Sequence, residues 1–301
     1  MKRSVAARRP LWHTAHESDS IMSPRPPTAI DSAKTRDSRS RTNLDPIVRC
    51  ADALAYSSVL ATAIAASLSL AASRTLRAPG EIHWATLAAT GTFIIYSLDR
   101  FRDVERDRLT SPARTAFVLH HRRALGFTVG LAAIVFAIAL LQAPWPIIAL
   151  CVAIGSVGFF HRRLKRFSAL KAAYVSIAWI AACIGMPWIA IGGGEAGLWA
   201  CAILFPTLAA NLHASNLRDD EAPLLSRRSK GTGSGLWLAR AATGLAIVIA
   251  LGAPPDLRAL VWIPLFEALA LAAFRASERY GHLAVDGALL AGALATCIAA
   301  A

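Results

Sequence analysis

Residues 124–160 read ALGFTVGLAAIVFAIALLQAPWPIIALCVAIGSVGFF and contain no Lys, Arg, Asp or Glu. A helix needs about 20 mainly apolar residues to cross the hydrocarbon core of a membrane. This stretch is therefore too long for one crossing and long enough for two. Pro144 and Pro146 lie near its middle, where they would interrupt a helix. The stretch predicts a hairpin of two membrane-spanning helices.

Further apolar stretches lie on both sides of this hairpin. They cover residues 53–73, 82–98, 172–194, 196–217, 234–253, 259–274 and 282–301. Together with the hairpin they predict nine membrane-spanning helices and an all-α polytopic membrane protein. The composition agrees, because 55% of the 301 residues are hydrophobic and only 17% are charged, which excludes an ordinary soluble globular domain.

The chain divides into two parts by composition. Residues 1–46 are polar and rich in Arg, Ser, Thr and Pro, and they contain no apolar stretch that could act as a signal peptide. We interpret them as a disordered basic tail, and residues 47–301 as the nine-helix membrane domain. The five cysteines are scattered and form no CxxC or Cys/His cluster, so the sequence supports neither a disulfide framework nor a zinc site.

The positive charges are distributed very unevenly along the predicted topology. When the segments between helices are assigned to alternating sides, 27 of the 32 Lys and Arg residues fall on one side and three on the other. Cytoplasmic segments carry such an excess, which predicts an integral membrane protein, expected in a bacterial inner membrane, with its N-terminus in the cytoplasm. Because this bias explains the net charge of +13, we expect membrane lipid and no nucleic acid as a partner.

Four charged residues lie inside predicted helices, all close to the cytoplasmic side: Lys171, Arg240, Glu267 and Asp286. Charged groups within a membrane are costly, and they usually line a wet cavity, pair with one another or extend toward the surface. Two interpretations stay open. The first is extension of helix-end side chains toward the surface together with an Arg240–Glu267 ion pair. The second is a cavity that opens to the cytoplasm.

The first acidic segment follows the apolar residues 82–98 and reads Asp99-Arg-Phe-Arg-Asp103-Val-Glu-Arg-Asp107. Positions i, i+4 and i+8 share one face of a helix, so we expect the three Asp carboxylates to lie in a row. Neighbouring arginines could simply neutralise this row on a solvated helix. Alternatively, the row could bind Mg²⁺, which prefers a few carboxylate oxygens together with phosphate oxygens.

A second acidic segment, Asn216-Leu-Arg-Asp219-Asp220-Glu221, follows the apolar residues 196–217. The predicted topology places both acidic segments at the cytoplasmic side. Two acidic helix ends with basic residues beside them are typical of a clamp that binds a metal and a diphosphate, in which cations neutralise the charge of the leaving group. An apolar tail on the substrate would lie between the helices. His161, His213 and His282 also lie near this surface, where we interpret them as polar boundary residues.

In these features residues 50–301 resemble the UbiA superfamily of intramembrane prenyltransferases. The resemblance rests on the nine-helix plan, on the two acidic segments, and on the stretch Phe160-His-Arg-Arg-Leu-Lys165-Arg166 with Lys171 downstream. It implies a helix bundle around a central cavity open to the cytoplasm. It also implies Mg²⁺ as the cofactor, a polyprenyl diphosphate as the donor and a small, often aromatic acceptor.

The resemblance also implies roles for individual residues. It assigns catalysis and metal binding to Asp103, Asp107 and Asp219, and substrate binding to Arg114, Lys165 and Lys171. From the acidic segments themselves we add Asp99 and Asp220 as metal ligands and Asn216 as a substrate-binding residue. Two positions depart from the family pattern, because Asp99 stands where the family commonly has Asn, and Pro223 stands where it usually has a second Asp. Pro223 favours an alternative, a catalytically inactive member that acts as a lipid-binding or scaffold protein. A transporter is a third hypothesis, motivated by the intramembrane charges.

Overall fold

The computed structural model describes residues 46–164, 168–219, 232–275, 277 and 280–301, and these residues form helices and no β-strand. They belong to one compact unit, Pro46–Ala301. Five helical segments are long and apolar enough to cross a membrane: Arg122–Leu141, Ala172–Ala190, Glu195–Ser215, Gly235–Gly252 and Gly281–Ala299. Val59–Thr75 and Trp145–Phe160 are shorter apolar helices. The total of nine crossings stays a prediction.

The first predicted helix, residues 53–73, is wrong as a single element. The chain forms α2 (Pro46–Tyr56) and α3 (Val59–Thr75), separated at Ser58, whose φ of 69° is incompatible with a continuous right-handed helix. The hydroxyl of Ser97 in α4 lies 3.3 Å from that of Ser58. A contact between distant parts of the chain therefore accompanies the break, and apolar periodicity could not indicate it.

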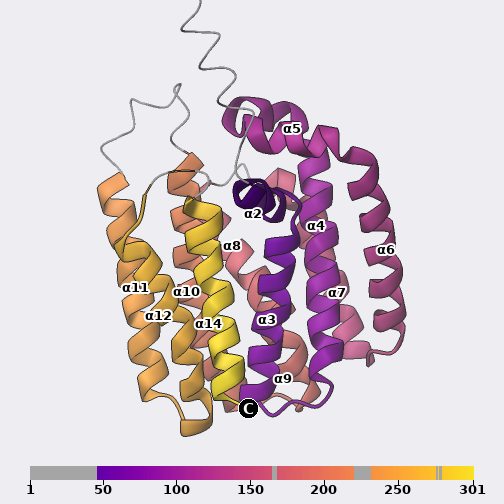
Figure 1. Ribbon diagram of the computed structural model, residues 1–301. Coiled ribbons are helices and arrows are strands. Elements are labelled where there is room, and N and C mark those ends of the chain that lie inside the picture. Colours follow the sequence, from indigo (N-terminus) through magenta and orange to yellow (C-terminus); the bar gives the residue numbers. More distant parts are fainter. Residues whose placement is uncertain (1–45, 165–167, 220–231, 276, 278–279) are drawn as a thin grey trace, which may run out of the picture. The chain divides into compact units, whose positions relative to one another are not determined.

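The next helix, α4 (Glu81–Thr110), contains both the apolar residues 82–98 and the whole first acidic segment. A short helix that the sequence analysis did not predict, α5 (Pro112–His120), follows it and crosses the same end of the bundle (Figure 1). Pro112 is at the start of α5, where a proline has no helical hydrogen bond to lose.

The charge-free stretch forms two helices joined by a turn, and of these two described helices only the first is long and apolar enough to cross a membrane. Its helices are α6 (Arg122–Leu141) and α7 (Trp145–Leu164), and the turn between them contains Pro144. The following pass consists of α8 (Ser168–Ile180), a π-helical turn η1 (Ala181–Gly185) and α9 (Met186–Ala190). It ends at Gly192, Gly193 and Gly194, which all have positive φ angles that favour glycine.

The remaining helices complete the unit. They are α10 (Glu195–Asp219), α11 (Thr232–Gly252), the 3₁₀ helix η3 (Pro255–Val261) with α12 (Trp262–Ala272), and the π-helical turn η4 (Gly281–Val285) with α14 (Asp286–Ala299). In Figure 1, α3 and α4 lie side by side, and α14 packs on α3 and on α12. The main core is formed by side chains from several helices. It contains the fully buried Leu68 of α3, Ile147 of α7, Leu204 of α10 and Ile263 of α12.

Candidate functional site at the acidic end of the bundle

The candidate site lies at the end of the bundle where α4 and α10 both end, which we call the acidic end and define by residues 99–110, 211–219 and 281–286. The contacts there join distant parts of the chain. The amide Nδ2 of Asn211 in α10 lies 3.4 Å from Oδ1 of Asp286 at the start of α14. Asp286 also lies close enough to Arg100 of α4 to interact electrostatically. The two helices that carry the acidic segments therefore end near the same residues (Figure 1).

The three aspartates of α4 lie on one continuous helix but in different surroundings. Asp103 is buried, with 6% of its surface exposed, whereas Asp99 and Asp107 are half-buried. The carboxylate Oδ2 of Asp107 accepts a hydrogen bond from Nη2 of Arg114 in α5 at 2.9 Å. The carboxylate row thus faces protein on at least part of its length and is not an ordinary solvated helix face.

Arg114 retains donor capacity beyond this ion pair. Its Nε is buried and has no hydrogen-bond partner among the described residues. A buried donor without a partner is costly, and a phosphate oxygen is a suitable acceptor for it. Arg114 is therefore placed beside the acidic row with one N–H group still available.

The arginines of α4 behave differently from one another. Arg102 lies over the ring of Phe159 in α7, 5.1 Å from its centroid, and Arg108 forms an exposed ion pair with Glu105 at 3.3 Å. The sequence analysis did not predict a role for Arg100. It follows Asp99 directly, and nothing in the sequence distinguishes it from the other arginines of the segment. One residue along a helix turns the side chain by about 100°, and this rotation directs Arg100 toward α2.

Arg100 connects α2 to α4. Its guanidinium donates to the backbone oxygens of Tyr56 and Ala55, the latter at 3.1 Å. Arg100 lies just beyond the apolar residues 82–98, and burial lowers its pKa to about 10, with nearby Arg114 contributing to the decrease. The group stays charged at neutral pH.

Replacing Arg100 with Gln is expected to release α2. Loss of hydrogen bonds from a charged donor costs about 1.5–3 kcal/mol, which corresponds to a roughly ten- to hundredfold faster amide hydrogen exchange when opening is local. Hydrogen-exchange mass spectrometry of residues 46–56 measures this directly. Arg108→Gln, which removes only an exposed pair, is the matched control and should leave exchange in α2 unchanged; equal exchange in both variants would contradict the role of Arg100.

Several predicted site residues fall outside what the structure describes. Lys165 and Asp220 lie outside the described residues, as does Pro223. The side chains of Lys171, Asn216 and Asp219 also lie outside them, although their backbones belong to α8 and α10. Within the side chains that are described, no three His, Cys, Asp or Glu residues cluster in a way that could hold a metal ion.

The intramembrane charges do not pair as one interpretation proposed, and the expected Arg240–Glu267 ion pair is wrong. The guanidinium of Arg240 in α11 instead donates to the backbone oxygens of Leu271 and Ala272, each at 3.0 Å. These carbonyls end α12 and lack partners within the helix, so a cation there is favourable. The sequence shows that Arg240 and Glu267 are present. It does not show that the backbone oxygens at the end of α12 bind Arg240 in place of Glu267.

The structure describes the surroundings of two of the three histidines that were interpreted as polar boundary residues. His282 is more than a boundary residue, because its Nδ1 lies 3.1 Å from Oδ2 of Asp286 and its ring packs edge-on against Tyr56. Nε2 of His213 is buried and without a partner among the described residues. The side chain of His161 lies outside the described part of the chain.

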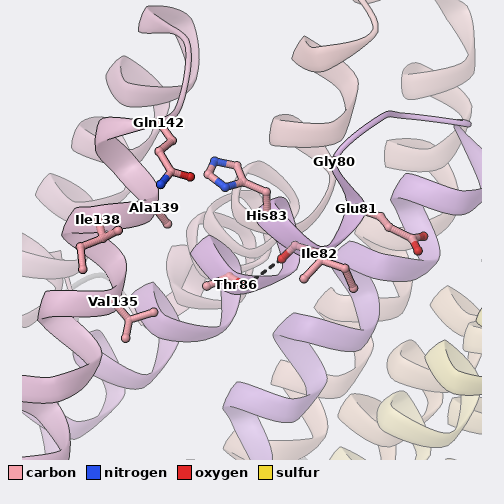
Figure 2. Close-up of a pocket in the computed structure, with 9 residues that line it drawn as sticks. All are labelled: Gly80, Glu81, Ile82, His83, Thr86, Val135, Ile138, Ala139 and Gln142. Carbon is pink, nitrogen blue, oxygen red and sulfur yellow. Dashed lines mark hydrogen bonds between the residues drawn. The ribbon is translucent and has the colours of Figure 1, made fainter.

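A pocket of about 650 Å³ lies at the other end of α4, far along the helix from the acidic segment. It is lined by residues 80–83 and 86 at the start of α4 and by residues 135, 138, 139 and 142 at the end of α6. Figure 2 shows His83 and Gln142 pointing toward one another across it. This pocket is distinct from the cavity expected at the acidic end, which stays a prediction.

Comparisons with protein-family models, with curated proteins and with solved structures found no match.

Proposed function

We propose that this protein is an integral-membrane prenyltransferase that transfers a polyprenyl group from its diphosphate to a small acceptor. One observation supports it most strongly. The acidic row of α4 and the end of α10 lie at the same end of the bundle, with a buried carboxylate and buried arginine donors beside them. The resemblance of the two acidic segments to those of the UbiA superfamily adds the expectation of a diphosphate substrate.

The residues present suit a magnesium ion shared with a diphosphate. Mg²⁺ usually takes one or two protein carboxylates and completes its shell with phosphate oxygens and water, so it does not require a preformed cluster of three protein ligands. Its protein ligands would come from Asp99, Asp103 and Asp107 of the first segment and from Asp219 and Asp220 of the second. When bound, Mg²⁺ supplies positive charge that stabilises the departing diphosphate.

The protein's cations would bind the same diphosphate. The Nε–H group of Arg114, beside Asp107, has no hydrogen-bond partner among the described residues, and a guanidinium is well suited to binding phosphate oxygens. The proposal extends to Lys165 and Lys171, which the resemblance assigns to substrate binding, and to Asn216 of the second acidic segment. The prenyl tail would lie between the apolar helices. Water would then be excluded from the bond between the prenyl carbon and the diphosphate oxygen, which is broken during transfer.

The proposal includes a topology. The protein would cross the bacterial inner membrane nine times around a cavity that opens to the cytoplasm, where the N-terminus also lies. The uneven distribution of Lys and Arg carries this part of the proposal.

The test is a transfer assay with the full-length protein in lipid. Radiolabelled polyprenyl diphosphates of several chain lengths are supplied with a panel of phenolic acceptors, and labelled apolar products are measured. We expect product with Mg²⁺, a fall to the background rate with excess EDTA, and recovery when Mg²⁺ is restored. Binding of the diphosphate without turnover on any acceptor, and without dependence on Mg²⁺, would instead favour an inactive lipid-binding protein.

A further inference from the structure

Glu267 in α12 is the most deeply buried charged residue among those described. None of its surface is exposed, and neither carboxylate oxygen has a hydrogen bond of normal geometry within the described residues. Asn211 of α10 is close enough to interact with this carboxylate. An ionised carboxylate without a cation or hydrogen-bond donors is one of the costliest groups to bury.

Among the residues that the structure describes, none of the groups around Glu267 supplies a positive charge for it. From α10 it meets Asn211, and from the start of α14 it meets the negative field of Asp286, which is itself paired with His282. From α11 the available cation is Arg240, but its guanidinium is bound to the backbone oxygens at the end of α12. Two carboxylates therefore approach one another with a single amide between them.

The count of donors and acceptors decides which of the two carboxylates is neutral. Asp286 receives Nδ2 of Asn211 at 3.4 Å on one oxygen and Nδ1 of His282 at 3.1 Å on the other. Neither oxygen of Glu267 has such a contact among the described residues, and none of its surface is exposed. Of two close carboxylates, the one that is fully buried and unpaired is the one that takes up a proton.

We propose that Glu267 is a proton-binding site inside the helix bundle, occupied at neutral pH. With the proton bound, Glu267 is neutral, and of the two carboxylates Asp286 alone carries a negative charge. No two buried charges of like sign then face one another. Asp286 also interacts electrostatically with Arg100 of α4. The carboxylate of Asp286 therefore connects the proton-binding site to the acidic end of the bundle.

Infrared spectroscopy of the full-length protein in lipid tests this proposal without any substrate. A protonated carboxyl group has a C=O stretch that is separate from the bands of carboxylates. We expect this band at pH 7, and we expect it to shift when all glutamates carry ¹³C at the carboxyl carbon. The wild-type measurement decides the proposal by itself, because absence of a glutamate-dependent band would overturn it.

Two variants assign the band to a residue. Glu267→Gln keeps a neutral side chain of nearly the same shape, so it should fold and lose the band. Glu81→Gln is the matched control, since Glu81 is paired with Arg74 at 2.9 Å at the other end of the bundle, and it should keep the band. A band that survives in a folded E267Q protein would also overturn the proposal. Neither outcome depends on whether the protein transfers prenyl groups.

Discussion

Asp103→Asn is expected to lower the rate of the proposed prenyl transfer by about 100- to 1,000-fold, the range found when one preorganised electrostatic group is removed from an active site. Asp103 is the central carboxylate of the row on α4 and its most buried member, with 6% exposure. Asparagine preserves the shape of the side chain but not its negative charge, so the protein should fold while a bound metal loses an anionic ligand. Turnover at saturating Mg²⁺ and donor measures the effect.

Glu105→Gln is the control for this substitution. Glu105 lies two residues away on the same helix, and its carboxylate, which is paired with Arg108, is 80% exposed. Both variants remove one negative charge from the same segment, so a general change in surface charge affects them equally. We expect Glu105→Gln to stay within about twofold of the wild type, because isolated surface charges contribute little. Equal activities of the two variants would remove the acidic row from the proposed mechanism.

The second large effect concerns stability and does not depend on the function. Gly292→Ala is expected to destabilise the protein by about 1–3 kcal/mol, the usual cost of forcing extra atoms into a packed interior. A Cβ atom at Gly292 would lie 2.7 Å from Cα of Ile263 and 2.8 Å from the backbone oxygen of Trp262. Because these atoms belong to the backbone of α12, the two helices must move apart.

The loss should appear as a lower midpoint of thermal unfolding in detergent, followed by the fraction of protein that stays monodisperse. Gly244→Ala in α11 is the matched control, since a Cβ atom there meets nothing within 4 Å. Alanine favours helix over glycine by about 0.8–1 kcal/mol, so this variant should be unchanged or more stable. If Gly292→Ala unfolded at the same temperature as Gly244→Ala, the close packing of α12 on α14 would be refuted.

Much of the fold follows from the apolar patterning. The charge-free residues 124–160 predicted a hairpin of two membrane-spanning helices. The chain forms α6 and α7 there, with Pro144 in the turn between them, and of the two helices as described only α6 is long and apolar enough to cross a membrane. The break between α2 and α3 was missed because residues 53–73 contain no charged residue that would mark it and the deciding residue, Ser58, contacts α4. The short helix α5 was missed because its nine residues are too few to give the long apolar stretch by which helices were predicted.

The candidate site was only partly accessible from the sequence. Spacing alone put Asp99, Asp103 and Asp107 on one helix face, and α4 does continue through all three. Spacing could not show that Arg114 reaches back to Asp107, or that Arg100 turns away to bind the backbone of α2. These contacts depend on where α5 and α2 pack, which is a matter of tertiary structure.

The sequence by itself determined where the long apolar helical segments lie, because the absence of charge over about 20 residues is a local property. It also determined that acidic residues follow two of those segments. The partners of the buried polar groups were decided only by the tertiary structure. Arg240 binds a helix end and not Glu267, and Asn211 lies between two carboxylates. The reason is that a buried polar group takes the best partner within a few ångströms, and which groups are that close depends on the packing of helices far apart in the chain.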